Sequence, residues 1–307
     1  MNSVKGIPLA PICLFVYNRP IHTLSTLQSL KNCHLAKDSI LYIYADGQKP
    51  DASEDQIQKI NNVREIIRSD TWCKEVHIYE SEINLGLAKS IIKGIGEVTD
   101  KHDKAIIIED DLQLSPSFLE FMNEALDYYE ANKAVMHIAG FTPHVKGILP
   151  ETFFFPVPTC WGWATWRRAW QHFNPDAADL LPKVLNKGKR QFDFNYSINY
   201  VRMLKRNVNH KVDSWFIRWY ASIYLENGLC LHPGKSLVRN TGLDHSGINS
   251  YKSKVFETQI ADKILINEIP FEFSKRIIKR YICFNWKVKF RHIPEYAWRV
   301  LTRQLDT

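Results

Sequence analysis

The most visible absence in this sequence is a long hydrophobic run, since no stretch approaches the roughly 20 apolar residues that a membrane-spanning helix needs. The first apolar run, residues 12–17, ends at Asn18, Arg19 and Pro20 without the small-residue cleavage site of a signal peptide. Internal repeats and low-complexity linkers are also missing. We therefore expect a globular protein that is soluble or attached only peripherally to a membrane.

Clusters of cysteine and histidine are the second absence. The six cysteines are scattered, none of them forms a CxxC pair, and no Cys/His spacing fits a structural zinc site. Scattered free thiols are typical of a reducing compartment, which predicts a cytoplasmic location. With 307 residues, 45% of them apolar, the chain is long enough to bury a large core.

Acidic residues are almost missing from the C-terminal segment. Between residues 275 and 303 there are nine lysines and arginines against one acid, Glu295, whereas the whole chain carries a net charge of +7. Apolar and aromatic residues are mixed with these cations, which is typical of a segment that lies on an anionic surface such as the inner face of the cell membrane. A solvated basic face and an edge strand over residues 286–290 remain as alternatives. We expect no nucleic-acid partner, because basic charge alone is nonspecific.

Strand and helix patterns alternate over the first 130 residues. Apolar runs predict strands at residues 12–17, 41–45, 76–79 and 105–108. Helical patterns follow the first strand at residues 21–30, the third strand after residue 86 and through residue 95, and the fourth strand at residues 117–129. Short connections between such elements predict an α/β fold, a Rossmann-like and mostly parallel sheet with helices on both faces. The ends of the strands at Asn18, Asp46 and Glu109 should then meet along one edge of the sheet.

Three consecutive acids, Glu109, Asp110 and Asp111, follow the most apolar of these strands. Like charges at a partly buried strand end repel one another, and a bound divalent cation removes that cost. Mg²⁺ or Mn²⁺ held by one or two carboxylates could also neutralise a departing diphosphate. The alternative is a solvated acidic turn that caps the next helix, whose first turn favours negative charge. The triplet alone does not decide between these two interpretations.

Neighbouring motifs give the triplet a context. Residues 106–112 read IIIEDDL and residues 115–119 read SPSFL, with FVYNRP at 15–20, YADG at 44–47 and VDSWF at 212–216. In this order the motifs resemble inverting glycosyltransferases of the GT-A fold related to Golgi N-acetylglucosaminyltransferase I. They are also similar to bacterial surface-polysaccharide glycosyltransferases. The resemblance spans roughly residues 10–250 and is concentrated in these short motifs.

The resemblance implies a role for each matching residue. Asp111 would be the direct ligand of Mn²⁺ or Mg²⁺, with Glu109 and Asp110 around the sugar and the ribose of the donor. Arg19 and Asp46 would contact the nucleoside and its neighbours. These roles together describe a site for a nucleotide sugar, and a UDP-sugar is the expected donor.

Asp213, in the VDSWF motif, is the expected general base. In a direct displacement the acceptor hydroxyl must lose a proton as it attacks the anomeric carbon, and one carboxylate on the side away from the diphosphate suffices. Asp213 could equally be the N-cap of a helix predicted at residues 214–226. The two roles are compatible, because a helix N-terminus is a rigid mount for a carboxylate.

Two further segments carry candidate contacts to the donor. Residues 240–247, NTGLDHSG, predict a loop of the kind that closes over a bound donor, with His245 as a ligand of the metal or the diphosphate. His232 is the rival for that role, and an ordinary exposed loop histidine is the alternative for His245. Lys89 lies at a turn before a helix, where it is either a phosphate contact or a surface lysine.

The composition changes beyond residue 140, where prolines and aromatics lead into a tryptophan-rich stretch. Trp163, Trp166 and Trp170 fall at i, i+3 and i+7, which predicts a buried helical stripe, and only Trp161 is a candidate for stacking on an acceptor sugar. We expect a donor-binding half at residues 1–130, an acceptor-binding and catalytic-base half at 131–270, and a basic aromatic tail at 271–307.

The expected function is transfer of a hexose or N-acetylhexosamine from a UDP-sugar to a glycan acceptor, by metal-dependent and inverting displacement. An acceptor linked to polyprenyl diphosphate would suit a tail that lies on a membrane. A retaining transferase on the same fold is the nearest alternative. A sugar-nucleotidyltransferase would need a Gly-rich loop after the first strand, which Asn18, Arg19 and Pro20 do not offer. A non-catalytic nucleotide-binding module is the remaining alternative.

Overall fold

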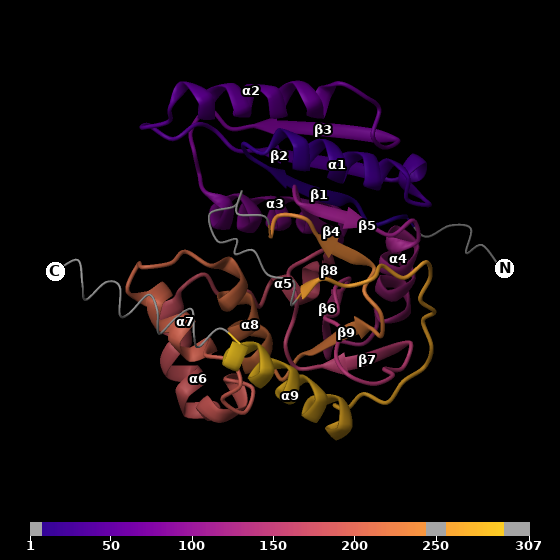
Figure 1. Cartoon of the computed structure of the whole chain (residues 1–307), viewed down its shortest axis with the longest axis vertical. Coiled ribbons are helices and arrows are strands. Elements are labelled where there is room, and N and C mark those ends of the chain that lie inside the picture. Colours follow the sequence, from indigo (N-terminus) through magenta and orange to yellow (C-terminus); the bar gives the residue numbers. More distant parts are fainter. Residues whose placement is uncertain (1–7, 244–255, 292–307) are drawn as a thin grey trace.

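The computed structural model describes residues 8–243 and 256–291, which fold around one large sheet (Figure 1). Strands and helices alternate through the N-terminal part, as expected. In chain order these elements are β1 (Ile12–Val16), α1 (Pro20–Lys31), the short 3-10 helix η1 (Ala36–Asp38), β2 (Ile40–Ala45), α2 (Glu54–Arg68), β3 (Glu75–Glu80), α3 (Leu87–His102) and β4 (Lys104–Glu109).

The second part of the chain adds short strands and most of the helices. Its elements are β5 (Leu112–Leu114), α4 (Phe118–Tyr128), β6 (Val135–Ala139), β7 (Thr152–Phe155), β8 (Trp163–Trp166), α5 (Arg167–Trp170), α6 (Ala177–Phe192), α7 (Tyr200–Val208), α8 (Trp215–Leu225), β9 (Leu229–Pro233), β10 (Val238–Asn240) and α9 (Lys275–Arg291). Within the described residues, no helix is both long enough and apolar enough to cross a membrane.

The sheet has eight strands in the order β3-β2-β1-β4-β8-β6-β9-β7. Strands β3, β2, β1 and β4 are parallel, β8 runs antiparallel to β4 and β6, β9 is parallel to β6, and β7 is antiparallel to β9. A separate two-stranded sheet joins β10 to β5. The mostly parallel α/β fold predicted from the alternating pattern is therefore confirmed.

Helices cover both faces of the sheet because successive residues of its central strands point to opposite faces. Leu14 of β1 packs in one core with Leu27 of α1 and Val63 of α2. Phe15, the next residue, packs in a second core with Ile91 of α3. Since these strands are buried on both faces, their sequence is continuously apolar rather than alternating.

The tryptophan-rich stretch differs from its prediction. Trp163 and Trp166 begin and end strand β8, and only Trp170 lies in a helix, the short α5, so the predicted helical stripe is wrong. All three side chains are nevertheless buried, as expected for core residues. Strand β8 lies between β4 and β6 and is buried on both faces, so its apolar pattern is not limited to alternate positions.

The basic segment also has a structure of its own. Residues 275–291 form helix α9, so the edge strand considered for residues 286–290 is wrong. Ile277 and Tyr281 are buried on this helix, and the Tyr281 ring lies 4.3 Å from that of Phe155 in β7. Helix α9 thus packs along the base of the molecule beside α6 and α8 (Figure 1). The rest of the predicted tail, residues 292–307, lies outside the described residues.

Two buried histidines, His137 in β6 and His232 in β9, make the stability of the protein depend on pH. Burial lowers the pKa of His232 to about 4 and lowers that of His137 well below its ordinary value. Both imidazoles are therefore neutral in the folded protein, whereas the unfolded chain binds protons below about pH 6.5. Stability from these residues is fully present above that pH and is lost as the pH falls toward 4.

We expect His232→Gln to reduce this pH dependence. Between pH 7 and pH 4.5, the loss of unfolding free energy should be smaller than in the parent protein by about 2 kcal/mol. Urea unfolding at the two pH values measures it. His210→Gln is the control, since His210 is exposed, and an unchanged pH dependence in His232→Gln would contradict the argument.

Candidate active site

The strand ends meet as the alternation predicted. In the sheet register Val16 at the end of β1 pairs with Ala45 at the end of β2, and Phe15 pairs with Glu109 at the end of β4. The segments that follow these strands, starting at Tyr17, Asp46 and Asp110, therefore leave the same edge of the sheet. This edge is where open α/β sheets bind their ligands.

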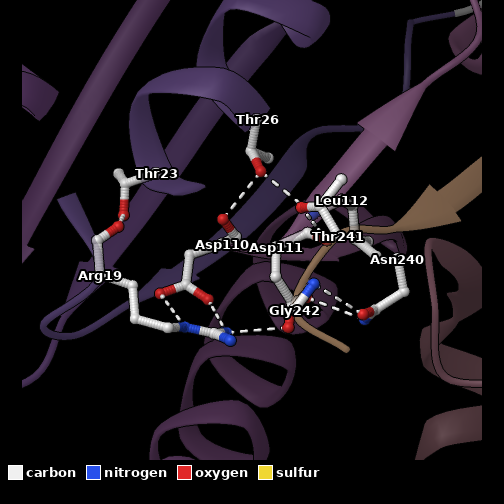
Figure 2. A network of polar contacts seen from close by, with 9 residues as sticks. All are labelled: Arg19, Thr23, Thr26, Asp110, Asp111, Leu112, Asn240, Thr241 and Gly242. Carbon is white, nitrogen blue, oxygen red and sulfur yellow. Dashed lines mark hydrogen bonds and ion pairs between the residues drawn. The ribbon is translucent and has the colours of Figure 1, made fainter. Parts of the chain in front are cut away.

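A side chain of helix α1 forms hydrogen bonds with the backbone of the acidic turn (Figure 2). Pro20 occupies the first turn of α1, where a missing N–H has no cost, so the helix starts directly after Arg19. About two turns after Arg19, the Thr26 hydroxyl donates to the carbonyl of Asp110 at 2.8 Å and accepts from the Leu112 N–H at 3.1 Å. The turn between β4 and β5 is thereby fixed to the helix that carries Arg19.

Arg19 joins two of the three acids. Its guanidinium pairs with both oxygens of Asp110, and its Nη2 lies 2.9 Å from Oδ2 of Asp111 (Figure 2). All three side chains are largely shielded, with exposed fractions of 18% for Arg19, 7% for Asp110 and 13% for Asp111. Charged hydrogen bonds of this kind are strong because little water competes for them.

The charges in the turn are nevertheless unbalanced, because Glu109 adds a third carboxyl group beside the two aspartates that pair with Arg19. Burial raises the pKa of Glu109 to about 8, and the neighbouring Asp111 and Asp110 charges add to that effect. Burial also raises the pKa of Asp110 to about 6, although Arg19 opposes the shift. Further positive charge at this turn would therefore favour the ionised carboxylates.

Strand β10 brings a distant segment over Asp111. Asn240 pairs with Leu112 in the antiparallel ladder, and its side-chain amide donates to Oδ1 of Asp111 at 3.1 Å. The N–H and hydroxyl of Thr241 donate to the Asp111 carbonyl at 2.7 and 3.0 Å (Figure 2). The segment after β10 therefore begins at the acidic turn, and the loop predicted to close over the donor stays a prediction, since residues 244–255 lie outside the described residues.

Gly242 lies where no side chain fits. A Cβ built on it would come 2.2 Å from Oδ2 of Asp111 and 2.8 Å from Nη1 of Arg19. We expect Gly242→Ala to lower the unfolding free energy by about 1–2 kcal/mol, because the carboxylate or the guanidinium must leave its partner. Chemical denaturation measures the change.

Gly96 provides a matched control for that substitution. It lies inside helix α3, and a Cβ there meets nothing within 4 Å. Gly96→Ala should therefore stabilise the protein by about 0.5–1 kcal/mol, since alanine favours the helix. If both substitutions changed stability in the same direction, the packing assigned to Gly242 would be wrong.

The acidic turn has the ligand types that Mg²⁺ or Mn²⁺ prefers. Asp110 and Asp111 both direct carboxylate oxygens at a single cationic group, here the Arg19 guanidinium. Among the described residues, no group of three or more His, Cys, Asp or Glu side chains could hold a metal ion. One or two carboxylates are what Mg²⁺ usually takes from a protein when substrate phosphates and water complete its shell.

Asp46 has a structural task at the same edge. Its Oδ1 accepts from the N–H groups of Gly47 and Leu85, and its Oδ2 accepts from the side chain of Asn84 and the N–H of Gly86, at 2.8–3.0 Å. The carboxylate therefore fixes the turn that starts α3. Its contact with a nucleoside stays a prediction.

The other predicted donor contacts divide into three cases. Lys89 is exposed in the first turn of α3, beyond the turn that Asp46 fixes. His245 lies outside the described residues. His232 is fully buried in β9, where its ring stacks on Phe153, so it does not lie at the acidic turn and cannot be the rival ligand.

Asp213 lies just outside helix α8. The N-cap of that helix is Ser214, whose hydroxyl accepts from the Ile217 N–H, so the prediction that Asp213 caps it is wrong. The Asp213 side chain is 60% exposed, and its Oδ1 accepts from Nη2 of Arg218 at 2.7 Å. The capping alternative is thereby removed, and an open carboxylate remains.

A stacked pair of tryptophans, one of them close to Asp213 in the sequence, packs the start of α8 against the sheet. The Trp215 ring lies 5.4 Å from the Trp163 ring in a stacked arrangement, and Trp163 pairs with Ile107 near the end of β4. The start of α8 is therefore packed beside the last residues of β4. Trp161, the acceptor candidate, is half-buried and has the ring of Phe141 edge-on at 4.4 Å.

Sequence reasoning missed several residues that shape the turn. Thr26 is an ordinary residue of a helical pattern, and nothing marks its hydroxyl as an anchor of the turn. Asn240 and Thr241 were assigned to a donor loop, but not to Asp111. No sequence signal links them to Asp111, because the pairing of β10 with β5 joins residues more than 120 positions apart.

Comparison with known proteins identifies the class. Residues 12–212 match the sequence model described as Glycosyl transferase family 2, which covers about two thirds of the chain. This span includes the acidic turn, Arg19 and Asp46 but ends one residue before Asp213. Comparison with curated protein sequences gives no match.

Solved structures show distant similarities. The mannosyltransferase PcManGT from Pyrobaculum calidifontis, in complex with GDP-Man and Mn²⁺, is 10% identical with a TM-score of 0.40, over 72% of this chain and 70% of that one. S. aureus TarS is 12% identical with a TM-score of 0.31, over 47% of this chain and 23% of that one. UDP-glucose pyrophosphorylase complexed with UDP-glucose is 8% identical with a TM-score of 0.36, over 74% and 91%.

Scores this low do not separate one activity from another, so the family match decides between the transferase and the nucleotidyltransferase alternatives. The match covers more than half of the chain, including the strand ends that build the site. The chain belongs to glycosyl transferase family 2, and it is a glycosyltransferase with the GT-A type of fold.

Proposed function

We propose that this glycosyltransferase transfers a hexose or N-acetylhexosamine from a UDP-sugar to a hydroxyl of a glycan acceptor, by metal-dependent inverting displacement. The single observation that carries the proposal is the buried acidic turn, where Asp110 and Asp111 face one cation. Burial raises the pKa of Glu109 and Asp110, so their charged forms are disfavoured, and a divalent ion bound at the turn would favour the ionised carboxylates.

In this proposal the residues of the turn share the donor. Asp111 would hold Mn²⁺ or Mg²⁺, which supplies positive charge to the leaving diphosphate. Glu109 and Asp110 would lie around the sugar and ribose, and Asp46 with the turn that it fixes would border the nucleoside. Arg19 partly shields the two aspartates from water, and it would contact the nucleoside and its neighbours in the bound donor.

The acceptor side rests on Asp213. Its exposed carboxylate would take the proton of the attacking hydroxyl, and its pair with Arg218 fixes its orientation. His245 would reach the diphosphate or the metal from the segment that starts at Thr241, and Lys89 would meet a phosphate from the start of α3. A glycan carried on a polyprenyl diphosphate at the inner face of the cell membrane is the proposed acceptor, because α9 presents several cations.

Calorimetric titration tests the donor. UDP should bind at least tenfold more tightly with Mn²⁺ than without it, and more tightly than GDP under the same conditions. A preference for GDP, or binding indifferent to metal, would overturn the proposed donor or its metal. A thermal-shift screen of UDP-sugars then selects the sugar, since a ligand that binds only the folded state raises the melting temperature.

The anomeric configuration of the product tests the mechanism. With the selected donor and a simple glycoside acceptor, proton NMR of the first product should show inversion at the transferred sugar. Retention would support the alternative, a retaining transferase on the same fold. That outcome would also remove the need for Asp213 as a base opposite the leaving group.

A further inference from the structure

A cavity of about 580 Å³ lies between helices α6, α8 and α9, on different elements from the acidic turn. Its volume falls in the range of pockets that hold drug-sized ligands. Most of its wall is apolar or aromatic. The side chains that form this part of the wall are Phe194, Tyr220, Tyr224, Phe273, Ile278 and Ile282.

The two tyrosines leave only their rings to a ligand. The Tyr220 hydroxyl donates to the carbonyl of Phe192 at 2.9 Å, and the Tyr224 hydroxyl donates to the carbonyl of Gly188 at 3.1 Å. Both hydroxyls are therefore satisfied within the protein. The interior of the cavity thus suits a hydrocarbon chain rather than a polar sugar.

Helix α9 is built to form one wall of this cavity. Ile277 and Tyr281 turn into the core, whereas Ile278 and Ile282, four residues apart, line the cavity and stay partly exposed. Lys275 and Lys279 line it as well and lie on the same face of the helix. The face of α9 toward the cavity is therefore apolar with two ammonium groups beside it.

The charged groups of the cavity are all positive. Arg190, Lys275 and Lys279 line it, and no carboxylate does within residues 8–243 and 256–291. Among the described residues the two lysines have no acidic partner, and the Nε of Arg190 donates to the Asn195 side chain at 3.0 Å. Lys275 is also the first residue of α9, where backbone N–H groups favour an anion. An anionic group at this position would be met by three cations.

We propose that this cavity binds a single-chain amphiphile with a phosphate head, its chain between Tyr220, Tyr224 and Ile282 and its phosphate at Lys275, Lys279 and Arg190. A lipid phosphate joins the two features that the cavity offers. A free phosphate would leave the aromatic wall unused, and an uncharged hydrocarbon would leave three cations without a partner. The inference rests on the cavity alone, because binding is measured without any sugar donor.

Decyl phosphate, used below its micelle concentration, is a suitable probe. By isothermal titration calorimetry, it should bind the full chain at least 100-fold more tightly than inorganic phosphate and at least tenfold more tightly than decanol. Equal affinity for decyl phosphate and inorganic phosphate would reduce the site to an anion site and overturn the proposal. Equal affinity for decyl phosphate and decanol would equally overturn it.

Two pairs of lysines separate the cavity from general surface charge. Lys275→Gln with Lys279→Gln should weaken decyl phosphate binding about tenfold or more, since two charged hydrogen-bond donors are lost. Lys37→Gln with Lys263→Gln removes the same charge at exposed positions outside the cavity, and it should leave the affinity unchanged. If the two double variants weakened binding equally, or neither did, the cavity would not be the site.

A third variant tests the apolar half. Ile278→Trp keeps the charges and places a larger ring toward the cavity, so it should abolish binding of decyl phosphate while leaving the protein folded. Circular dichroism and a cooperative thermal unfolding transition check that the variant is folded, independently of any nucleotide. Retained decyl phosphate binding by a folded Ile278→Trp protein would place the chain elsewhere and contradict the inference.

Discussion

Asp111→Asn is expected to lose the metal-dependent part of UDP binding, with a fall in affinity of at least about tenfold in the presence of Mn²⁺. The amide is nearly the same size, and its single oxygen can accept from Asn240 or from Arg19 but not from both. The Thr241 contacts go to the Asp111 backbone carbonyl and are unaffected. The fold should survive while the charge that faces the cation is lost. Calorimetry of UDP with and without Mn²⁺ measures the effect.

Asp55→Asn is the matched control for this substitution. Asp55 makes an exposed ion pair with Lys59 in α2, and such pairs contribute little to stability. It should bind UDP and Mn²⁺ as the parent protein does. Metal-stimulated UDP binding that persisted in Asp111→Asn would show that the ion is held elsewhere, and the proposed role of the acidic turn would fail with it.

Asp213→Asn is expected to keep donor binding and to lower kcat by a factor of about 10²–10⁴, which is the usual contribution of a general base. Its side chain is exposed and bonded only to Arg218, so its replacement should leave the helix α8 intact. Initial rates of sugar transfer, together with UDP calorimetry, separate the two effects. Loss of turnover with unchanged UDP affinity is the expected pattern.

A second substitution at the same position tests the need for a carboxylate. Asp213→Glu keeps the charge but moves it by one methylene, so it should recover part of the rate that Asp213→Asn loses. If Asp213→Asn transferred sugar at the parental rate, the base would have to be another residue. If both variants lost UDP binding as well, Asp213 would belong to the donor site instead.

The N-terminal half was predictable because its physics is local. Four apolar runs separated by helical patterns predicted parallel strands, and the register confirms that the ends of β1, β2 and β4 meet at one edge. The position of Glu109 at that edge follows from the strand that precedes it. A strand buried on both faces is continuously apolar, so its sequence reveals its place in the sheet.

The second half shows where such reasoning fails. Trp163, Trp166 and Trp170 matched a helical spacing by coincidence, since a strand buried on both faces can carry apolar residues at any spacing. Helix α9 was read as one basic and aromatic surface segment, although Ile277 and Tyr281 are buried against the body. Which face of a helix or strand is buried depends on the elements that pack against it, and these are often distant in the sequence. A single sequence does not show which elements they are.

The acidic turn was predicted as a set of residues but not as an arrangement. Two separate motifs contained Arg19 and Asp111, yet nothing in their spacing of 92 residues indicates that they form an ion pair. The hydrogen bonds from Thr26 and Asn240 were equally unpredictable, since they join segments that meet only in the folded chain. A sequence shows which residue types are present, but it does not show the distances between residues in the folded protein.

The pairing of Arg19 with Asp110 and Asp111 has a consequence for how the protein matures. A newly synthesised chain already contains a cationic group that pairs with both aspartates, so we expect it to fold without a supply of manganese or magnesium. Treatment with a chelator should therefore stop catalysis but leave the protein folded. Activity should return as soon as the metal is restored, without a refolding step.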